Sequence, residues 1–236
     1  TQPANQTINV GGNTTFNVTA TGGSGTTSHQ WQVSTNNGTT WTNITNGGVY
    51  SGATSATLTI TGATALLSGN LYRDSITQSN YVCGNVISNT AKLCVVSISG
   101  TLNVCAGSTT TLTGSGTAAT TNPWTSSNTS IATVNNSGVV TGVSAGTVTI
   151  TYTDNKGCSQ TATVTVTAAP VSGTLSGTQN VCVGLTTTFS STQTGGTWSS
   201  SATGIATINA TTGVITGVAA GTATITYTVA GTGGCP

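Results

Sequence analysis

The sequence predicts an all-β fold class, with three tandem antiparallel β-sandwiches arranged as an elongated rod. Short segments in which threonine alternates with valine or another apolar residue follow one another along the chain, and this pattern is typical of half-buried strands. No window shows a sustained helical periodicity. A stretch that begins at Cys105 occurs again 77 residues later at Cys182. Self-similarity at a long fixed period indicates tandem modules.

The composition excludes several classes of partner. Only 2% of the 236 residues are charged, and the formal net charge is +1. We therefore expect no nucleic-acid partner and no attraction to an acidic membrane. No apolar run approaches the length of a membrane-spanning helix, so we expect no membrane insertion. Because the sequence has neither an initiator methionine nor a signal peptide, we expect it to be a mature or excised part of a longer protein.

Residues 1–95 form a first unit that does not match the repeat. A strand is predicted at 15–20, and the next strand contains Trp31. The sequence NNG at 36–38 predicts the hairpin that follows, since asparagine and glycine accept positive φ angles. Later strands are predicted at 57–60, 71–76 and 86–95. About seven short strands with frequent turns indicate a sandwich of two antiparallel sheets.

Residues 96–169 form the second unit, and residues 170–236 form the third. In the second unit, Val148, Ile150 and Tyr152 share one face of a predicted strand, opposite a face of threonines. The third unit repeats most of this sequence, so the same strands are predicted in it.

The third unit lacks a counterpart to the last strand of the second. After Cys158 the second unit continues with SQTATVTVTA, whereas only Pro236 follows Cys235. One interpretation is that the chain, or its ordered part, was cut at this place. Another is that a neighbouring chain or later sequence supplies the strand, because an uncovered sheet edge is a template for strand addition. A stable domain with an open edge is the third alternative.

The first unit resembles an immunoglobulin-like (Ig-like) domain. Trp31 occupies the position of the strand C tryptophan, and Tyr72-Arg73-Asp74 stands where such domains carry Tyr-x-Cys. Ala20 and Asp74 occupy the two cysteine positions, so the resemblance implies a sandwich without the inter-sheet disulfide. The segments WQVSTNNGTTWTNI and NGGVYSGATSATLTITGA are also similar to the Ig-like modules of large secreted proteins of the Bacteroidota.

The second and third units resemble the bacterial Ig-like family (group 2) of intimin- and invasin-type adhesins. The segment IATVNNSGVVTGVSAGTVTITYT carries the resemblance, together with Trp124 before it. It recurs in the third unit as IATINATTGVITGVAAGTATITYT after Trp198. The resemblance implies Ig-like sandwiches in an extracellular adhesin or filament at the cell surface.

Four cysteines are placed alike in the two repeats. Cys105 and Cys158 are 53 residues apart, and so are Cys182 and Cys235. Equal placement in two copies predicts one disulfide within each unit, Cys105–Cys158 and Cys182–Cys235. Each bond would stabilise its unit by roughly 4 kcal/mol in the chain-entropy model, and it indicates an oxidising, extracellular compartment. The alternative is a metal site, but no CxxC spacing is present and the single histidine, His29, lies in another unit.

Cys83 and Cys94 have no clear pairing. Cys83 lies in the predicted turn NYVCG, and Cys94 lies near the end of the following strand. A straight strand of ~11 residues at 3.3 Å per residue would keep the two sulfurs far apart. Both cysteines stay unassigned: they are free, or they join neighbouring modules or chains.

The chain offers few groups for catalysis, so we predict that it is not an enzyme and holds no cofactor or metal. His29, Asp74 and Asp154 are its acids or bases near neutrality. His29 is interpreted as a surface or strand-edge residue, and Asp154 as part of a hairpin turn. Asp74 and the adjacent Arg73 point to opposite faces of a strand and cannot pair. Calcium would need several carboxylates, which the sequence lacks.

Two further assignments concern single side chains. One tryptophan recurs at the same site of each unit, Trp31, Trp124 and Trp198, and we interpret the three as core residues rather than ligand contacts. Asp74-Ser75-Ile76 resembles a short O-glycosylation motif of the Bacteroidota, which makes Ser75 a candidate glycosylation site.

These observations favour a non-catalytic extracellular protein whose Ig-like repeats form the stalk or shaft of a bacterial surface adhesin or filament. Its partners would be neighbouring modules or copies of the same protein. One alternative is a self-assembling fibre subunit in which the incomplete third unit accepts a strand. Another is a module that binds a surface glycan or a host protein. The fourth hypothesis, a segment of a secreted enzyme, would need a catalytic domain elsewhere in the parent chain.

Overall fold

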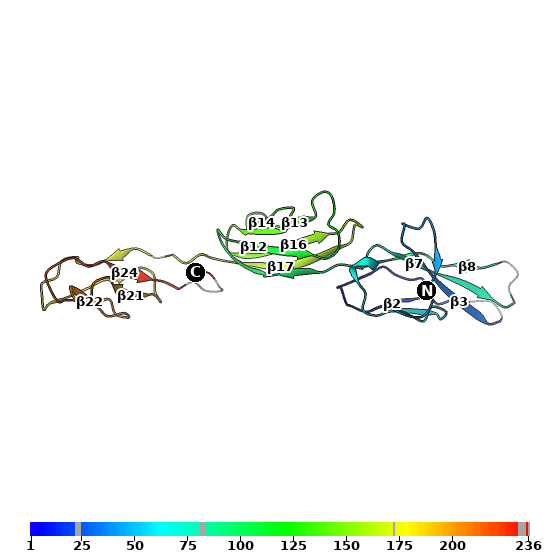
Figure 1. Cartoon of the computed structure of the whole chain (residues 1–236), viewed down its shortest axis with the longest axis horizontal. Helices are drawn as coiled ribbons and strands as arrows, with labels where there is room; N and C mark the ends of the chain where they lie inside the picture. Colours follow the sequence, from blue (N-terminus) through cyan, green and yellow to red (C-terminus); the bar gives the residue numbers. More distant parts are fainter. Residues whose placement is uncertain (22–24, 81–83, 172, 231–234, 236) are drawn as a thin grey trace.

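The computed structural model describes residues 1–21, 25–80, 84–171, 173–230 and 235. Figure 1 shows three groups of strands that follow one another along the long axis of the molecule. Apart from one short 3-10 helix, η1 (Ala65–Leu67), every regular element in these ranges is a β-strand. The predicted all-β fold of tandem Ig-like sandwiches in an elongated arrangement is therefore confirmed.

The first sandwich is built from β1 (Gln6–Ile8), β2 (Thr14–Asn17), β3 (Thr27–Ser34), β4 (Thr42–Asn43), β5 (Tyr50–Ser51), β6 (Thr57–Ile60), β7 (Leu71–Gln78), β8 (Val86–Ile87) and β9 (Ala91–Val95). Its larger sheet has the order β1-β9-β7-β3-β4, and β8 also pairs with β7. The smaller sheet has the order β2-β6-β5.

The two sheets of the first sandwich enclose an aromatic core. Phe16, Trp31 and Tyr72 are at most 1% exposed, and the rings of Phe16 and Tyr72 stack with their centroids 4.9 Å apart. Trp31 donates a hydrogen bond from Nε1 to the Ser55 carbonyl at 2.8 Å, which satisfies its polar atom. Buried and less buried positions alternate along β2 and β6, as the pleat requires.

The hairpin expected at 36–38 joins β3 to β4. Asn37 and Gly38 have φ angles of 56° and 85°, which asparagine and glycine adopt more readily than other residues. The Asn36 side chain closes the turn, because its Oδ1 accepts a hydrogen bond from the Thr40 N–H at 2.9 Å. The predicted hairpin is therefore confirmed.

The strand expected at 86–95 is interrupted instead. β8 and β9 are separated near Ser88, whose buried hydroxyl accepts a hydrogen bond from the Asp74 N–H at 2.9 Å and donates one to the Asn89 carbonyl at 2.8 Å. A side chain that bonds to the main chain in this way competes with the strand ladder. After the interruption, β9 pairs with β1 in parallel, so the first strand of the sandwich lies beside the last.

The second sandwich is built from β10 (Ile98–Gly100), β11 (Asn103–Cys105), β12 (Thr109–Gly114), β13 (Trp124–Ser126), β14 (Ala132–Val134), β15 (Val139–Gly142), β16 (Gly146–Thr153) and β17 (Ser159–Thr167). One sheet has the order β10-β12-β15-β14, and the other has the order β11-β17-β16-β13. β11 is parallel to β17, and the other pairs are antiparallel.

The alternation along β16 decides which of its faces is buried. Val148, Ile150 and Tyr152 point into the core and are at most 3% exposed. Tyr152 packs against Trp124 with the ring centroids 4.7 Å apart. β17 covers the same core, and its Val164 is fully buried. The threonines between these residues form the outer face of the sheet.

The third sandwich is built from β18 (Leu175–Ser176), β19 (Thr186–Thr188), β20 (Ser190–Ser191), β21 (Thr197–Ser200), β22 (Ala206–Ile208), β23 (Val214–Gly217) and β24 (Ile225–Thr228). These strands form three small sheets, β18-β20, β19-β23-β22 and β21-β24. Trp198 lies opposite Tyr227 in β21-β24, as Trp124 lies opposite Tyr152 in β13-β16. The repeat in the sequence is therefore a repeat in the structure.

In the described part of the chain, β24 has a partner on one side only. Its counterpart β16 lies between β13 and β17, whereas β24 pairs with β21 alone. Residues 180–182, which correspond to β11, form no strand. The reason is that β11 makes its ladder with β17, and the described third sandwich offers no strand at that place.

Candidate functional site

Two disulfides connect the sandwiches to one another. Cys94 in β9 bonds to Cys158, which lies between β16 and β17. Cys105, the last residue of β11, bonds to Cys235. Cys182 is free and exposed. The predicted pairs Cys105–Cys158 and Cys182–Cys235 are therefore wrong, because each bond joins two successive sandwiches instead of closing one.

The geometry of β17 explains why Cys105 and Cys158 do not pair. Cys158 immediately precedes β17, and Cys105 lies opposite Thr167, the last residue of that strand. Nine residues of strand span about 30 Å. A disulfide needs Cα atoms roughly 4.4–6.8 Å apart. Cysteines at opposite ends of one sandwich can therefore bond only to its neighbours.

The first junction is centred on the buried carboxylate of Asp154, which is 3% exposed. Its Oδ2 accepts a hydrogen bond at 2.7 Å from the hydroxyl of Ser68, which follows η1 in the first sandwich. Its Oδ1 accepts hydrogen bonds from the N–H groups of Lys156 and Cys158 at 2.9 and 2.8 Å. The carboxylate therefore shapes the turn between β16 and β17 and attaches that turn to the first sandwich.

Further contacts extend across the first junction. The Lys92 ammonium donates a hydrogen bond to the Lys156 carbonyl at 2.6 Å. The Gln160 amide donates one to the Asn9 side chain at 2.9 Å. Val96, between the last strand of the first sandwich and the first strand of the second, is fully buried in the core of the second. The first junction is thus a packed interface reinforced by the Cys94–Cys158 bond.

The second junction has a different construction. Cys235 is 5% exposed, is bonded to Cys105 and has its sulfur 3.8 Å from the Thr167 carbonyl at the end of β17. Figure 1 accordingly shows the C-terminal end of the chain between the second and third sandwiches. Val229 stands where the second sandwich has Asp154, so this junction has no equivalent carboxylate.

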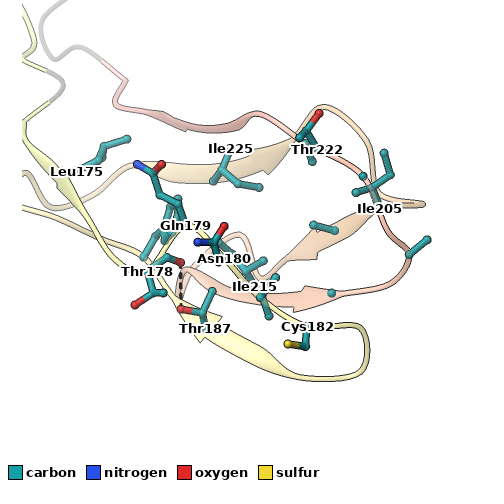
Figure 2. A pocket seen from close by; sticks show the side chains of 17 residues that line it. Leu175, Thr178, Gln179, Asn180, Cys182, Thr187, Ile205, Ile215, Thr222 and Ile225 are labelled. Atoms are coloured by element: carbon teal, nitrogen blue, oxygen red, sulfur yellow. Dashed lines mark hydrogen bonds between the residues drawn. The ribbon is translucent and has the colours of Figure 1, made fainter.

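The third sandwich has an open groove over its core. Figure 2 shows Ile215 and Ile225 among the side chains that line this cavity of about 700 Å³. Ile225 is half-buried, whereas its counterpart Ile150 in β16 is fully buried. In the second sandwich, Val164 and Val166 of β17 cover the equivalent positions and are 0% and 2% exposed. The groove therefore lies where a strand like β17 would pack.

A histidine–aspartate pair lies inside the larger sheet of the first sandwich. His29 Nδ1 and Asp74 Oδ2 are 2.6 Å apart, and the two side chains are 12% and 0% exposed. Asp74 Oδ1 also accepts a hydrogen bond from the Gln30 N–H at 3.1 Å. The interpretation of His29 as a surface residue is wrong, since its side chain is 12% exposed and hydrogen-bonded to Asp74. β4 pairs with β3 at Gln32 and Val33, so His29 lies beyond that pairing. Arg73 points to the other face, 4.0 Å from the centroid of the Trp41 ring.

The structure also places the remaining residues singled out from the sequence. Ser75 is 7% exposed and accepts a hydrogen bond from the Asn85 amide at 3.0 Å, so this candidate glycosylation site is buried in the folded sandwich. Cys83 lies outside the described residues. One tryptophan of each sandwich is at most 6% exposed: Trp31, Trp124 and Trp198.

Two negative findings apply to the described ranges alone. No group of three or more histidine, cysteine, aspartate or glutamate side chains there could hold a metal ion. The helical turn found there is far too short to cross a membrane.

Sequence reasoning missed Asp154 and its partner Ser68, because the segment DNKG has the composition of an ordinary hairpin turn. A weak signal was present. The chain has two acidic residues among 236. In a sequence with so few charges, a carboxylate suggests a specific hydrogen-bond donor beside it in the folded protein. Both carboxylates are in fact buried and hydrogen-bonded.

Comparison with known proteins finds two family models that match parts of the chain. Residues 95–166 match the bacterial Ig-like domain (group 2) family. Residues 1–97 match a family described as a domain of unknown function, DUF8696. No curated protein matches the sequence. Neither family description names an enzyme.

Several solved structures are similar to parts of the chain. An intimin mutant of EHEC O157:H7 is 25% identical over 30% of this chain and 45% of that one, with a TM-score of 0.25. The N-terminal four Ig domains of Dscam1 isoform 1.9 are 15% identical over 70% of this chain and 43% of that one, with a TM-score of 0.40. The N-terminal eight Ig domains of Down Syndrome Cell Adhesion Molecule isoform 1.30.30 are 13% identical over 89% of this chain and 34% of that one, with a TM-score of 0.39. The chain spans less than half the length of each of these structures.

Proposed function

We propose that this chain is a non-catalytic extracellular segment with a structural and adhesive role. Its Ig-like repeats form the stalk or shaft of a bacterial surface adhesin or filament. The observation that carries the proposal is that both disulfides, Cys94–Cys158 and Cys105–Cys235, join successive sandwiches. A covalent bond across each junction keeps the sandwiches connected when the chain is pulled, as a stalk requires. The match of residues 95–166 to bacterial Ig-like domains supports the same function.

The chemistry of the chain supports a location outside the cytoplasm. Disulfides persist in oxidising compartments and are rare in the reducing cytosol. Only three lysines or arginines are present, so trypsin-like proteases in the surroundings find few cleavage sites. Only 2% of the residues are charged, and threonine, serine and asparagine make up much of the surface. This chemistry favours neighbouring modules and copies of the same protein as partners.

A role without catalysis fits the environment of the acid–base groups. The His29–Asp74 pair is packed within a sheet, and Asp74 is fully buried, so a substrate cannot reach the carboxylate. A module that binds a glycan or a host protein remains the alternative. Three of the four tryptophans are buried, and the fourth, Trp41, is stacked under Arg73. The described aromatic side chains therefore do not favour a sugar-binding platform.

Negative-stain electron microscopy of native, non-reduced protein tests the rod. We expect straight particles about 100 Å long, since each sandwich measures roughly 30 Å along its strands. Cys235→Ser should introduce variable angles at the second junction. Cys158→Ser, the matched variant, should leave the first junction straight, because Asp154 and its neighbours still connect the sandwiches there. Compact native particles without a fixed axis would contradict the proposal.

The open groove favours a second function, that of a fibre subunit completed by a strand from a neighbouring molecule. β17 shows which chemistry fits the groove, because it turns Ala162, Val164 and Val166 towards the core and threonines outward. An exposed sheet edge takes up such a strand through main-chain hydrogen bonds and side-chain pockets.

Peptide binding tests this second function. The peptide SQTATVTVTA, residues 159–168, should bind the chain and change the fluorescence of Trp198, which lies in the core of the third sandwich. A control peptide with aspartate in place of Val164 and Val166 should not bind, because it would bury two charges. Equal binding of the two peptides would exclude strand uptake in the register of β17.

A further inference from the structure

The positively charged side chains of the chain lie together in one place. The sequence has three lysines or arginines among 236 residues: Arg73, Lys92 and Lys156. Arg73 lies in β7 and Lys92 in β9, two neighbouring strands of the larger sheet of the first sandwich. Lys156 lies in the turn between β16 and β17, which contacts the first sandwich. We call these three residues the cationic strip.

The strand register places Arg73 and Lys92 on the same face of the sheet. Lys92 lies directly opposite Leu71. Arg73 is two residues beyond Leu71 on the same strand, so its side chain leaves the same face. Tyr72, between them, points into the core and is 0% exposed, so the cations are on the outer face. Residues placed diagonally in this way have their Cα atoms about 7–8 Å apart.

Lys156 adjoins this face from the second sandwich. The Lys92 ammonium donates a hydrogen bond to the Lys156 carbonyl at 2.6 Å. A Cβ atom added to Gly69, shortly before β7, would meet the Cβ of Lys156 at 2.6 Å. The base of the Lys156 side chain therefore lies against the chain that leads into β7. Lys156 is exposed, and Arg73 and Lys92 are half-buried.

The guanidinium of Arg73 is held in one orientation. Its Nε donates a hydrogen bond to Gln32 Oε1 at 2.8 Å, and its Cζ lies 4.0 Å from the centroid of the Trp41 ring. Gln32 is held in turn by Asn43, whose Oδ1 accepts a hydrogen bond from Gln32 Nε2 at 2.9 Å. Among the described residues, these contacts use neither terminal nitrogen of the guanidinium. A preorganised arginine of this kind can bind a carboxylate through two parallel hydrogen bonds.

The carboxylates of the chain do not neutralise the cationic strip. Asp74 and Asp154 are its two acidic residues, and they are 0% and 3% exposed. Asp74 forms the ion pair found in the described part of the chain, and its partner is His29. Asp154 accepts hydrogen bonds from Ser68 and from main-chain N–H groups. The net charge of +1 therefore understates the positive charge that this face presents to solvent.

We propose that the cationic strip binds an acidic glycan, a sugar chain that carries carboxylate groups. Arg73 binds one carboxylate through its two terminal nitrogens, and Lys92 and Lys156 attract the neighbouring ones. This inference rests on the adhesive role proposed above. It gives that role a ligand and places the binding site on the side of the rod, at the boundary between the first and second sandwiches.

The chemistry of this face favours a glycan over other polyanions. Nucleic acids are commonly held by about 6–10 phosphate contacts, and polybasic membrane-binding segments use clusters of about 4–8 lysines or arginines. This chain has three cations in all. An acidic glycan has hydroxyls between its carboxylates, and hydroxyls suit the amides of Gln32 and Asn43 beside Arg73. Recognition by charge and amides requires no platform of exposed aromatic rings.

Titration calorimetry of the native chain with hexagalacturonate, which carries one carboxylate on each sugar, tests the proposal. We expect saturable binding that weakens as the salt concentration rises, because the strip lies at the surface. Maltohexaose, an uncharged glycan of the same number of sugars, should not bind. Absence of hexagalacturonate binding at low salt would overturn the proposal.

Substitutions in the strip show whether it is the binding site. Arg73→Gln should raise the dissociation constant at least about tenfold, because charge-assisted hydrogen bonds are lost. Arg73→Lys should recover part of the affinity, since it keeps the charge but not the fork of donors. Lys156→Gln changes an exposed side chain and should raise the dissociation constant about threefold. Equal melting temperatures exclude misfolding, and native affinity in both glutamine variants would contradict the site.

A charge-matched control separates the site from the net charge. Thr226 is exposed in β24 of the third sandwich, so Thr226→Lys combined with Arg73→Gln restores the net charge far from the strip. The double variant should bind as weakly as Arg73→Gln alone. Recovery of native affinity would mean that net charge, and not the strip, attracts the glycan.

A second probe distinguishes glycan recognition from attraction to any polyanion. Hexathymidylate, a short single-stranded DNA, should bind at least about tenfold more weakly than hexagalacturonate, because its phosphates need more cations than the strip supplies. Equal affinities would overturn the assignment to a glycan. Straight rods that bind no glycan would leave the proposed stalk intact, whereas native chains without a rod would contradict the stalk itself.

Discussion

The hydroxyl of Ser68 donates a hydrogen bond of 2.7 Å to the carboxylate of Asp154 across the boundary between the first and second sandwiches, where both residues are buried. One of the two acidic residues of the chain is thus placed at a junction. Charge-assisted hydrogen bonds are strong where water is excluded. A specific polar contact therefore holds the first junction in addition to the Cys94–Cys158 bond.

Asp154→Ala should lower the free energy of unfolding by about 3 kcal/mol, because the Ser68 hydroxyl and the N–H groups of Lys156 and Cys158 lose their acceptor in a buried place. Urea titration followed by tryptophan fluorescence measures the change. Asn155→Ala is the matched control at the exposed neighbouring position of the same turn, and we expect it to change stability by less than about 0.5 kcal/mol. Equal losses in the two variants would show that the carboxylate has no special part in the junction.

The Cys105–Cys235 bond should shield the second and third sandwiches from a force applied to the two ends of the chain. Cys105 and Cys235 are 130 residues apart in the sequence. While the disulfide is intact, the chain between them cannot be stretched out, which shortens the maximum extension by roughly 450 Å. Single-molecule stretching of oxidised protein should therefore release the first sandwich and at most the short segment from Cys94 to Cys105, because neither disulfide bypasses that segment.

Cys105→Ser gives a graded control for the stretching experiment. In this variant the Cys94–Cys158 bond, with a separation of 64 residues, still shields most of the second sandwich, while the third becomes extensible. Reduction should release the full chain in every variant. If oxidised native protein extended as far as reduced protein, the load would not pass through the disulfides.

The first sandwich should lose stability in alkaline solution. Burial, and secondly the hydrogen bond with the Tyr50 hydroxyl at 3.0 Å, raise the pKa of Tyr72 above its ordinary value. The unfolded chain therefore ionises Tyr72 near pH 10 while the folded chain does not, so stability is fully present below about pH 10 and is lost as the pH rises beyond it.

Urea midpoints between pH 8 and pH 11.5, measured with the free thiols alkylated, show whether Tyr72 behaves in this way. Tyr72→Phe should be less stable at pH 8 by about 1 kcal/mol, since the bond with Tyr50 is lost. Its stability should then fall less steeply above pH 10 than that of the native chain. Parallel pH profiles for the two proteins would mean that other groups cause the alkaline loss.

The elements of the fold were predictable because their signals are local. Threonines that alternate with apolar residues specify a half-buried strand such as β16, whichever sheet it packs against. The NNG segment specifies a tight hairpin, because Asn37 and Gly38 adopt positive φ angles. The interruption between β8 and β9 was not predictable, because it depends on Ser88 meeting the main chain of Asp74, a residue of another strand.

The candidate site was less predictable, because it depends on which ends of the sandwiches meet. Equal spacing of Cys105–Cys158 and Cys182–Cys235 indicated a shared role for these cysteines, but spacing along the chain does not tell which end of a 30 Å module each cysteine occupies. In the same way, the approach of Asp74 to His29 depends on the register of β3 against β7, and the approach of Ser68 to Asp154 depends on how two sandwiches pack.

The central claim, that covalent bonds join successive sandwiches, is tested most directly by mapping the disulfides of native, alkylated protein. Digestion with chymotrypsin after aromatic residues and leucines separates the cysteines, since Leu102 divides Cys94 from Cys105. Mass spectrometry of the non-reduced peptides should find Cys94 linked to Cys158 and Cys105 linked to Cys235, with Cys182 in no bond within the monomer. Peptides that link Cys105 to Cys158 and Cys182 to Cys235 would contradict the account, because each sandwich would then close on itself.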